Sequence, residues 1–222
     1  TNVSNSTSNR LTNIRITCEK LNGTTVNTGD TFSFCEITGP STAEEGYKEA
    51  TMFLDGKEVQ SLGGGNCQVS STLYNAVLDV PDLKVTERHE HGKKVSYVPD
   101  GKDAAVSYGS IDFKFKNNTE APIYIEGSAS GSNVSFTIYG QETRAANRKV
   151  SFVSETLSTT DPGVKFEASS DAVGTITQTQ SAHVGKSARL WKVVTVDGVE
   201  QSREIFNKTT YKACLLYTSD AA

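Results

Sequence analysis

The chain has 222 residues, enough for one large hydrophobic core or two small ones, and its composition is ordinary for a globular protein. With 22 basic and 26 acidic residues its formal net charge is −4, which argues against a nucleic-acid-binding surface and gives no reason to expect binding to anionic lipid. No run of apolar residues approaches the length that a membrane-spanning segment needs.

The two ends of the sequence differ from the rest. Residues 1–9 are mostly Asn, Ser and Thr, so we expect a polar linker or the end of a truncated segment. Because the chain opens on Thr1 rather than Met, we expect its true start to be missing. Residues 214–222 read like the translation of a sequencing-library adapter, and we expect them not to be native.

Residues 10–140 predict a first domain that begins with a helix. Ser8 or Asn9 can cap this helix, and its apolar residues recur at helical spacing: Leu11, Ile14, Cys18 and Leu21. An extended segment over residues 26–34 should follow. A hairpin that turns at Asp55-Gly56 then delivers the chain to the triple glycine of residues 63–65.

A second helix is predicted directly after the triple glycine, since Val69, Leu73, Ala76 and Val77 repeat at helical spacing. Cys67 then lies at the helix N-terminus, where free N–H groups and the helix dipole favour the thiolate form of a thiol. The N–H groups of Cys67 and its neighbour are also candidates to hold an oxyanion. Two interpretations stay open: Cys67 is a catalytic nucleophile, or it is a small buried residue that closes a Gly-rich turn.

The strand predicted from Leu83 ends in a polar cluster with two of the three histidines, His89 and His91. Either is a candidate general base for Cys67, because an imidazole near its working pKa can take a thiol proton and return it. The alternative is a solvated strand end. Asp103, which opens a strand predicted over residues 104–108, is a candidate to orient the imidazole or an ordinary turn residue.

From Ile111 the apolar and polar residues alternate in three stretches, which predicts an antiparallel β-meander that ends near Gly140. One face of this sheet is apolar and needs the two helices to cover it. The expected fold class is therefore α+β, with an antiparallel meander covered by two helices. Residues 141–213 predict a small C-terminal all-β module with a hairpin that turns at Asp197-Gly198.

Specific motifs are spread along the first 140 residues: Asn13-Ile14-Arg15, Gly29-Asp30-Thr31-Phe32-Ser33-Phe34, Gly63-Gly64-Gly65-Asn66-Cys67-Gln68-Val69-Ser70-Ser71-Thr72-Leu73-Tyr74, Glu87-Arg88-His89-Glu90-His91, Val95-Ser96-Tyr97-Val98-Pro99 and Asp112-Phe113-Lys114-Phe115. With these motifs the segment resembles the VanW family, named from the glycopeptide-resistance (vancomycin-resistance) clusters of Gram-positive bacteria. The C-terminal module, with Trp191-Lys192-Val193-Val194-Thr195-Val196-Asp197-Gly198, resembles small extracellular β modules of the G5 type. The resemblance implies an extracellular, cell-surface or cell-wall protein that works at peptidoglycan, and it implies no settled reaction.

Two functions fit these residues. In the first, the protein is a thiol hydrolase or an acyl or peptidyl transferase on peptidoglycan stem peptides. Its catalytic residues would be Cys67, His89 or His91, and Asp103. In the second, it is a non-catalytic peptidoglycan-binding protein of the cell surface, linked to glycopeptide resistance, and the thiol only packs.

Both functions need a binding groove for a peptidoglycan fragment, or muropeptide. Its expected residues are Gly64, Gly65, Asn66, Gln68, Ser70, Arg88 and Tyr97. The sequence has no C-x-x-C pair, and we expect no metal site and no cofactor. We also expect no nucleic-acid partner and no membrane span within these residues.

Overall fold

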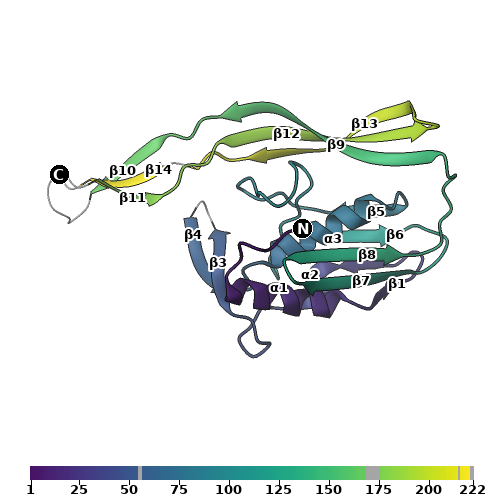
Figure 1. The fold of residues 1–222 in the computed structure, drawn as a ribbon, viewed down its shortest axis with the longest axis horizontal. Helices are drawn as coiled ribbons and strands as arrows, with labels where there is room; N and C mark the ends of the chain where they lie inside the picture. The colour runs from purple at the N-terminus through teal and green to yellow at the C-terminus, as the bar shows by residue number, and fades with distance from the viewer. Residues whose placement is uncertain (55–56, 169–175, 215, 221–222) are drawn as a thin grey trace.

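The structure, a computed structural model, describes residues 1–54, 57–168, 176–214 and 216–220. Figure 1 shows a helix-containing N-terminal part beneath a long β ribbon that is formed by the C-terminal strands. None of the helices in the described ranges is long and apolar enough to cross a membrane.

The described residues of the N-terminal part form three helices and eight strands. They are α1 (Ser8–Leu21), β1 (Thr24–Val26), β2 (Thr31–Ser33), α2 (Phe34–Thr38), β3 (Glu49–Leu54), β4 (Lys57–Leu62), α3 (Asn66–Leu78), β5 (Leu83–Glu87), β6 (Lys114–Asn117), β7 (Ile123–Ser130) and β8 (Asn133–Tyr139). α1 packs against β7 and α3 against β8, and the two helices contact each other. The predicted α+β class is confirmed.

The strands of this part form three separate antiparallel sheets, in the orders β1-β7-β8, β2-β6-β5 and β3-β4. Within the expected meander, β7 and β8 pair as predicted, whereas β6 pairs with β2 and β5. Asn117 explains the change of sheet, because its buried side chain donates to the carbonyls of Val26 and Ala121 and so ends β6. The two β3–β4 strands form the expected hairpin, and its Asp55-Gly56 turn lies outside the described residues.

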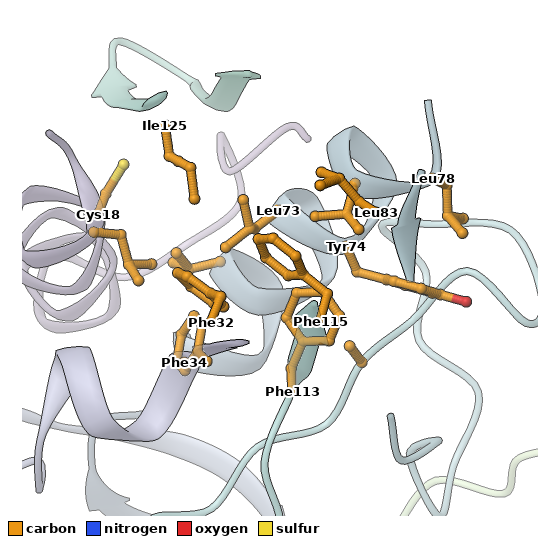
Figure 2. Close-up of a cluster of buried hydrophobic side chains, with 14 of the residues drawn as sticks. Cys18, Phe32, Phe34, Leu73, Tyr74, Leu78, Leu83, Phe113, Phe115 and Ile125 are labelled. Atoms are coloured by element: carbon orange, nitrogen blue, oxygen red, sulfur yellow. The ribbon is translucent and has the colours of Figure 1, made fainter. Parts of the chain in front are cut away.

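The core lies between the helices and the two three-stranded sheets, as Figure 2 shows. Most residues predicted from helical spacing belong to it, with Ile14, Cys18, Leu21, Leu73 and Val77 all nearly or fully buried. The predicted Leu11 and Ala76 are only partly buried, and the helices add Phe34, Tyr74 and Leu78, which the spacing did not indicate. The aromatic members come from the strands: the rings of Phe32 and Phe115 stack with centroids 4.7 Å apart. This stacking fastens β2 to β6 and joins the start of the domain to its middle.

Three local expectations differ from the structure. The extended segment predicted over residues 26–34 is broken by a turn between β1 and β2, in which the Asp30 N–H donates to the Asn27 carbonyl at 3.1 Å. It also ends one residue early, because Ser33 caps the short helix α2 by accepting from the Glu36 N–H at 3.1 Å. α1 is capped by Thr7, one residue before the expected cap. The expected linker at residues 1–9 lies against the domain instead: Val3 is 5% exposed, and its N–H donates to the carbonyl of Ser132.

The C-terminal strands are β9 (Arg148–Thr160), β10 (Val164–Ala168), β11 (Ile176–Gln180), β12 (Gly185–Val196), β13 (Val199–Tyr211) and β14 (Leu216–Asp220). β12 lies between β13 and β9 in an antiparallel sheet, and the predicted β12–β13 hairpin turns at Asp197 and Gly198, which both have positive φ. β14 lies between β10 and β11 at the far end of the ribbon. That residues 214–222 are not native stays a prediction.

Candidate active site

The triple glycine fixes the start of α3. Gly63 and Gly65 have φ of +83° and +119°, values that residues with side chains rarely adopt. A Cβ on Gly64 would lie 2.8 Å from the carbonyl oxygen of Ala50, so this position excludes any side chain on steric grounds. The loop therefore passes close to β3 and turns Cys67 onto the first turn of the helix, as the sequence predicts.

Asn66 fastens this loop to its surroundings. Its Oδ1 accepts a hydrogen bond from the Thr17 hydroxyl at 2.8 Å, and its Nδ2 donates to the Ser41 hydroxyl at 2.9 Å. Both polar atoms of the Asn66 amide are therefore hydrogen-bonded, and they connect the start of α3 to α1 and to Ser41.

The Cys67 thiol lies beside the backbone of Val106. The Val106 N–H donates to Sγ at 3.5 Å, and the carbonyl oxygen of the same residue is also 3.5 Å from Sγ. Burial raises the pKa of Cys67, but the hydrogen bond and the charge of His91 outweigh burial, and the net pKa lies below its ordinary value. These interactions favour the thiolate.

One of the two expected oxyanion donors is available. Within the described residues the N–H of Cys67 makes no hydrogen bond, whereas the neighbouring N–H of Gln68 donates to the carbonyl of Gly65 at 3.0 Å. A helix N-terminus leaves such donors free, and a free N–H beside a nucleophile can stabilise a developing oxyanion.

His91 joins the thiol to a buried carboxylate. Its Nδ1 is 2.7 Å from Oδ2 of Asp103, and its backbone N–H donates to the same oxygen at 2.8 Å. Nε2 lies 3.3 Å from the Tyr97 hydroxyl. Burial lowers the pKa of His91, but the hydrogen bonds with Asp103 and Cys67 raise it to about 9, so the imidazolium form is favoured next to the thiolate.

Asp103 is completely buried and is held as a carboxylate by its donors. Arg88 Nη2 and the Tyr211 hydroxyl each donate to Oδ1 at 2.6 Å. Burial raises the pKa of Asp103, but the hydrogen bond from His91 and the charge of Arg88 bring it down to about 2. A buried charge requires partners of this kind, since alone it would neutralise.

The C-terminal ribbon contributes directly to this arrangement. Besides Tyr211, Thr209 on β13 accepts a hydrogen bond from Arg88 Nη1 at 3.0 Å. The Tyr211 hydroxyl also accepts from the Gly101 N–H at 2.9 Å. The loop that bears His91 and Asp103 is therefore held between the N-terminal part and β13.

The other predicted catalytic histidine lies elsewhere. His89 Nε2 is 3.1 Å from Oε1 of Glu87, and its side chain is 43% exposed. β5 ends at Glu87, and apart from an isolated bridge between His89 and Ala105 residues 88–91 belong to no regular strand. The regular alternation of a strand therefore does not apply here, and His89 contacts Glu87 whereas His91 contacts Asp103. The strand expected over residues 104–108 is reduced to isolated bridges.

The expected groove residues divide into two groups. Gly64, Gly65, Asn66 and Tyr97 line a cleft of about 440 Å³ together with Cys67 and His91, and so does Gln68, whose side-chain amide donates to Thr1 and Asn2. Ser70 and Arg88 do not line the cleft. The Ser70 hydroxyl is buried against the Ala104 carbonyl at 2.6 Å, and the Arg88 guanidinium is occupied by Asp103.

Three residues that contribute to the candidate site are not predicted from the sequence: Arg10, Val106 and Tyr211. Arg10 precedes Ile14 by one helical turn and thus continues the buried face of α1, which is a signal that a charged residue approaches the interior. Val106 acts through its backbone, and Tyr211 is remote in sequence, so neither has a local pattern.

The described ranges contain no group of three His, Cys, Asp or Glu side chains that could hold a metal ion. All four cysteines are free thiols.

Comparison with known proteins identifies the N-terminal part. The family model described as "VanW like protein" matches residues 9–139. The uncharacterized protein YoaR of Bacillus subtilis is 39% identical over 137 residues, which cover 62% of this chain and 45% of YoaR. The vancomycin B-type resistance protein VanW of Enterococcus faecalis is 32% identical over 122 residues, 53% of this chain and 44% of that protein. The matches thus span less than half the length of these curated relatives.

Two solved structures of G5 domains match about a third of the chain. The G5 domain of an IgA1 protease covers 34% of this chain and 92% of its own, with 21% identity and a TM-score of 0.26. The G5 domain of HP0197 covers 33% and 95%, with 19% identity and a TM-score of 0.21.

Proposed function

The chain belongs to the VanW-like family, and from its cleft we propose that it is a thiol enzyme, a hydrolase or an acyl or peptidyl transferase, that acts on the stem peptides of peptidoglycan. The observation that favours catalysis is that Cys67 and His91 line the same open cleft, that the imidazole is hydrogen-bonded to the buried Asp103, and that the charge of His91 lowers the pKa of the thiol. A thiol that only packs needs neither an imidazole beside it nor a buried carboxylate behind that imidazole.

The geometry supports a role for each residue. Asp103 is hydrogen-bonded to Nδ1 of His91, so Nε2, which contacts the Tyr97 hydroxyl, is the nitrogen left to exchange a proton with the thiol. Tyr97, whose ring meets that of His91 edge-on with centroids 6.3 Å apart, limits its rotation. Asp103 and Tyr97 are therefore positioning residues, whereas Cys67 and His91 would react.

In the proposed reaction, the Cys67 thiolate adds to the carbonyl carbon of an amide, and the carbonyl electron pair moves to oxygen, where the Cys67 N–H can stabilise it. As the C–N bond breaks, the His91 imidazolium gives its proton to the departing amine, which leaves a thioester and a neutral imidazole. Water or a second amine then attacks the thioester and gives its proton to His91. The C–S bond breaks, and the thiolate–imidazolium pair is restored.

Peptidoglycan is proposed as the substrate because a relative in E. faecalis is named as a vancomycin-resistance protein, and because a cleft of about 440 Å³ suits a peptide segment better than a folded partner. The cell surface or cell wall is the corresponding proposed location. Stem peptides supply amide bonds that are accessible to a thiolate.

The first test is the pH dependence of iodoacetamide alkylation at Cys67, read by peptide mass spectrometry. We expect an apparent pKa below the free-thiol value of about 8.5, and a clear rise of that pKa in His91→Ala. His89→Ala is the matched control and should leave the profile unchanged, because His89 pairs with Glu87.

The second test is incubation of the native protein with a muropeptide digest of peptidoglycan, followed by intact-mass analysis. An acyl adduct on Cys67 that is absent in Cys67→Ala would support the reaction. A thiol that stays unreactive until the protein unfolds, together with muropeptide binding that survives in Cys67→Ala, would replace the enzyme with a wall-binding protein.

A further inference from the structure

Arg10 lines the same cleft, yet the reaction proposed above gives it no role. It lies on the first turn of α1, with its side chain beside the triple glycine, where its Cγ would be 3.3 Å from a Cβ on Gly65. Its Nη1 donates to the Ser6 hydroxyl at 2.8 Å. In the described part of the chain no Asp or Glu lies within ion-pair distance of this guanidinium.

The cleft around Arg10 is positive, although the whole chain carries a net charge of −4. Among the described residues that line it, none is Asp or Glu, and its charged groups are the Cys67 thiolate, Arg10 and the imidazolium of His91. The two cations outnumber the one anion, and a cleft with an excess of one sign of charge concentrates ligands of the opposite sign. The charge pattern therefore favours an anionic ligand.

The charge of Arg10 has one internal use, because it lies close enough to Cys67 to help lower the pKa of the thiol. That effect needs only a positive charge and does not engage the planar fork of the guanidinium. A fork with free N–H groups matches the two oxygens of a carboxylate, and such charge-assisted pairs are roughly twice as strong as neutral hydrogen bonds.

We infer that Arg10 binds a carboxylate of the substrate beside Cys67, so that the cleft selects anionic peptides over neutral ones of the same size. The inference rests on the proposed function, since it names the substrate class of the same thiol. The matched pair of reagents iodoacetate and iodoacetamide tests it without any substrate. Both reagents react at the same carbon and release iodide. They differ only in that iodoacetate carries a carboxylate where iodoacetamide carries an amide.

The measured quantity is the ratio of the alkylation rates of Cys67 by iodoacetate and by iodoacetamide, in the native protein and after unfolding. Both reagents meet the same thiolate, so any effect of Arg10 on the pKa of Cys67 cancels in the ratio. We expect the ratio to be higher in the native protein than in the unfolded one, and to fall roughly tenfold in Arg10→Gln. Arg10→Lys should retain part of the preference.

Arg15→Gln is the matched control, because Arg15 lies on the same helix but is exposed. In wild-type protein, added NaCl should lower the alkylation rate with iodoacetate and leave the rate with iodoacetamide nearly unchanged. This salt dependence tests the inference even if Arg10→Gln does not fold. Equal ratios in the Arg10 and Arg15 variants, or a rate with iodoacetate that is insensitive to salt, would overturn the inference and leave the thiol enzyme standing. A thiol that reacts with neither reagent in the native state would overturn both.

Discussion

Replacement of Tyr211 by Phe tests whether the C-terminal ribbon stabilises the candidate active site. The change removes only a hydroxyl, which donates to Asp103 Oδ1 at 2.6 Å and accepts from the Gly101 N–H at 2.9 Å. Both partners are buried, so neither can turn to water. Hydrogen bonds to charged groups contribute about 1.5–3 kcal/mol, and we expect Tyr211→Phe to lower the free energy of unfolding by about 2 kcal/mol.

The pKa of Asp103 gives the same scale. A value of about 2 in the folded protein instead of 3.8 corresponds to about 2 kcal/mol of stability, which is present above pH 3.8 and is lost as the pH falls through 2. Without the Tyr211 donor the folded pKa of Asp103 should rise. The variant should therefore start to lose stability at a higher pH than the wild type.

The assay is urea denaturation at pH 7 and at several acidic pH values, with Tyr139→Phe as the matched control. The Tyr139 hydroxyl donates to Glu126 Oε2 at 2.7 Å, but this pair is exposed and its loss should cost less than about 0.5 kcal/mol. Equal losses in the two variants would refute the conclusion that a buried, charge-linked contact joins the ribbon to Asp103. In addition, the alkylation rate of Cys67 should change in Tyr211→Phe and stay constant in Tyr139→Phe.

Two further predictions concern the loop and the histidine. Gly64→Ala places a methyl group 2.8 Å from the Ala50 carbonyl oxygen, so the melting temperature of the protein should fall by several degrees. Gly92→Ala is the control and should leave the melting temperature unchanged, because a Cβ at Gly92 meets open space. An unchanged melting temperature in Gly64→Ala would show that the loop can move away from β3. His91 has a folded pKa of about 9 against an ordinary 6.5, so its contribution to stability is complete below pH 6.5 and is lost as the pH rises through 9. Thermal unfolding between pH 6 and 10 should show this decline in wild type and a flatter profile in His91→Gln, and identical profiles would contradict the assigned ion pair.

Local patterns in the sequence predict the helices and much of the core. Leu73 and Val77 repeat at helical spacing and are buried, and the triple glycine predicts the tight approach that turns Cys67 onto α3. The sheet arrangement is less accessible, because strand pairing depends on contacts between distant segments. Asn117 changes the partner of β6 through hydrogen bonds to Val26 and Ala121, and nothing in its neighbours in sequence indicates this.

The candidate site shows the same division. Its candidate nucleophile, Cys67, follows from a local signal at a helix terminus. The choice between His89 and His91 does not, because β5 ends at Glu87, before the two residues that a regular strand would place on one face. Arg10 and Tyr211 reach the site from other elements, 57 residues before Cys67 and 108 residues after Asp103.

The hydrogen bond between the Tyr211 hydroxyl and Asp103 also bears on the order in which the chain folds. Its two ends are 108 residues apart, and closing so long a loop is slow compared with forming α3 or the β7–β8 hairpin. During synthesis the ribosome releases Cys67, His91 and Asp103 well before β13. The nascent N-terminal part therefore holds a thiol whose supporting carboxylate still lacks one of its donors. The site reaches its final hydrogen bonding only when the later strand docks.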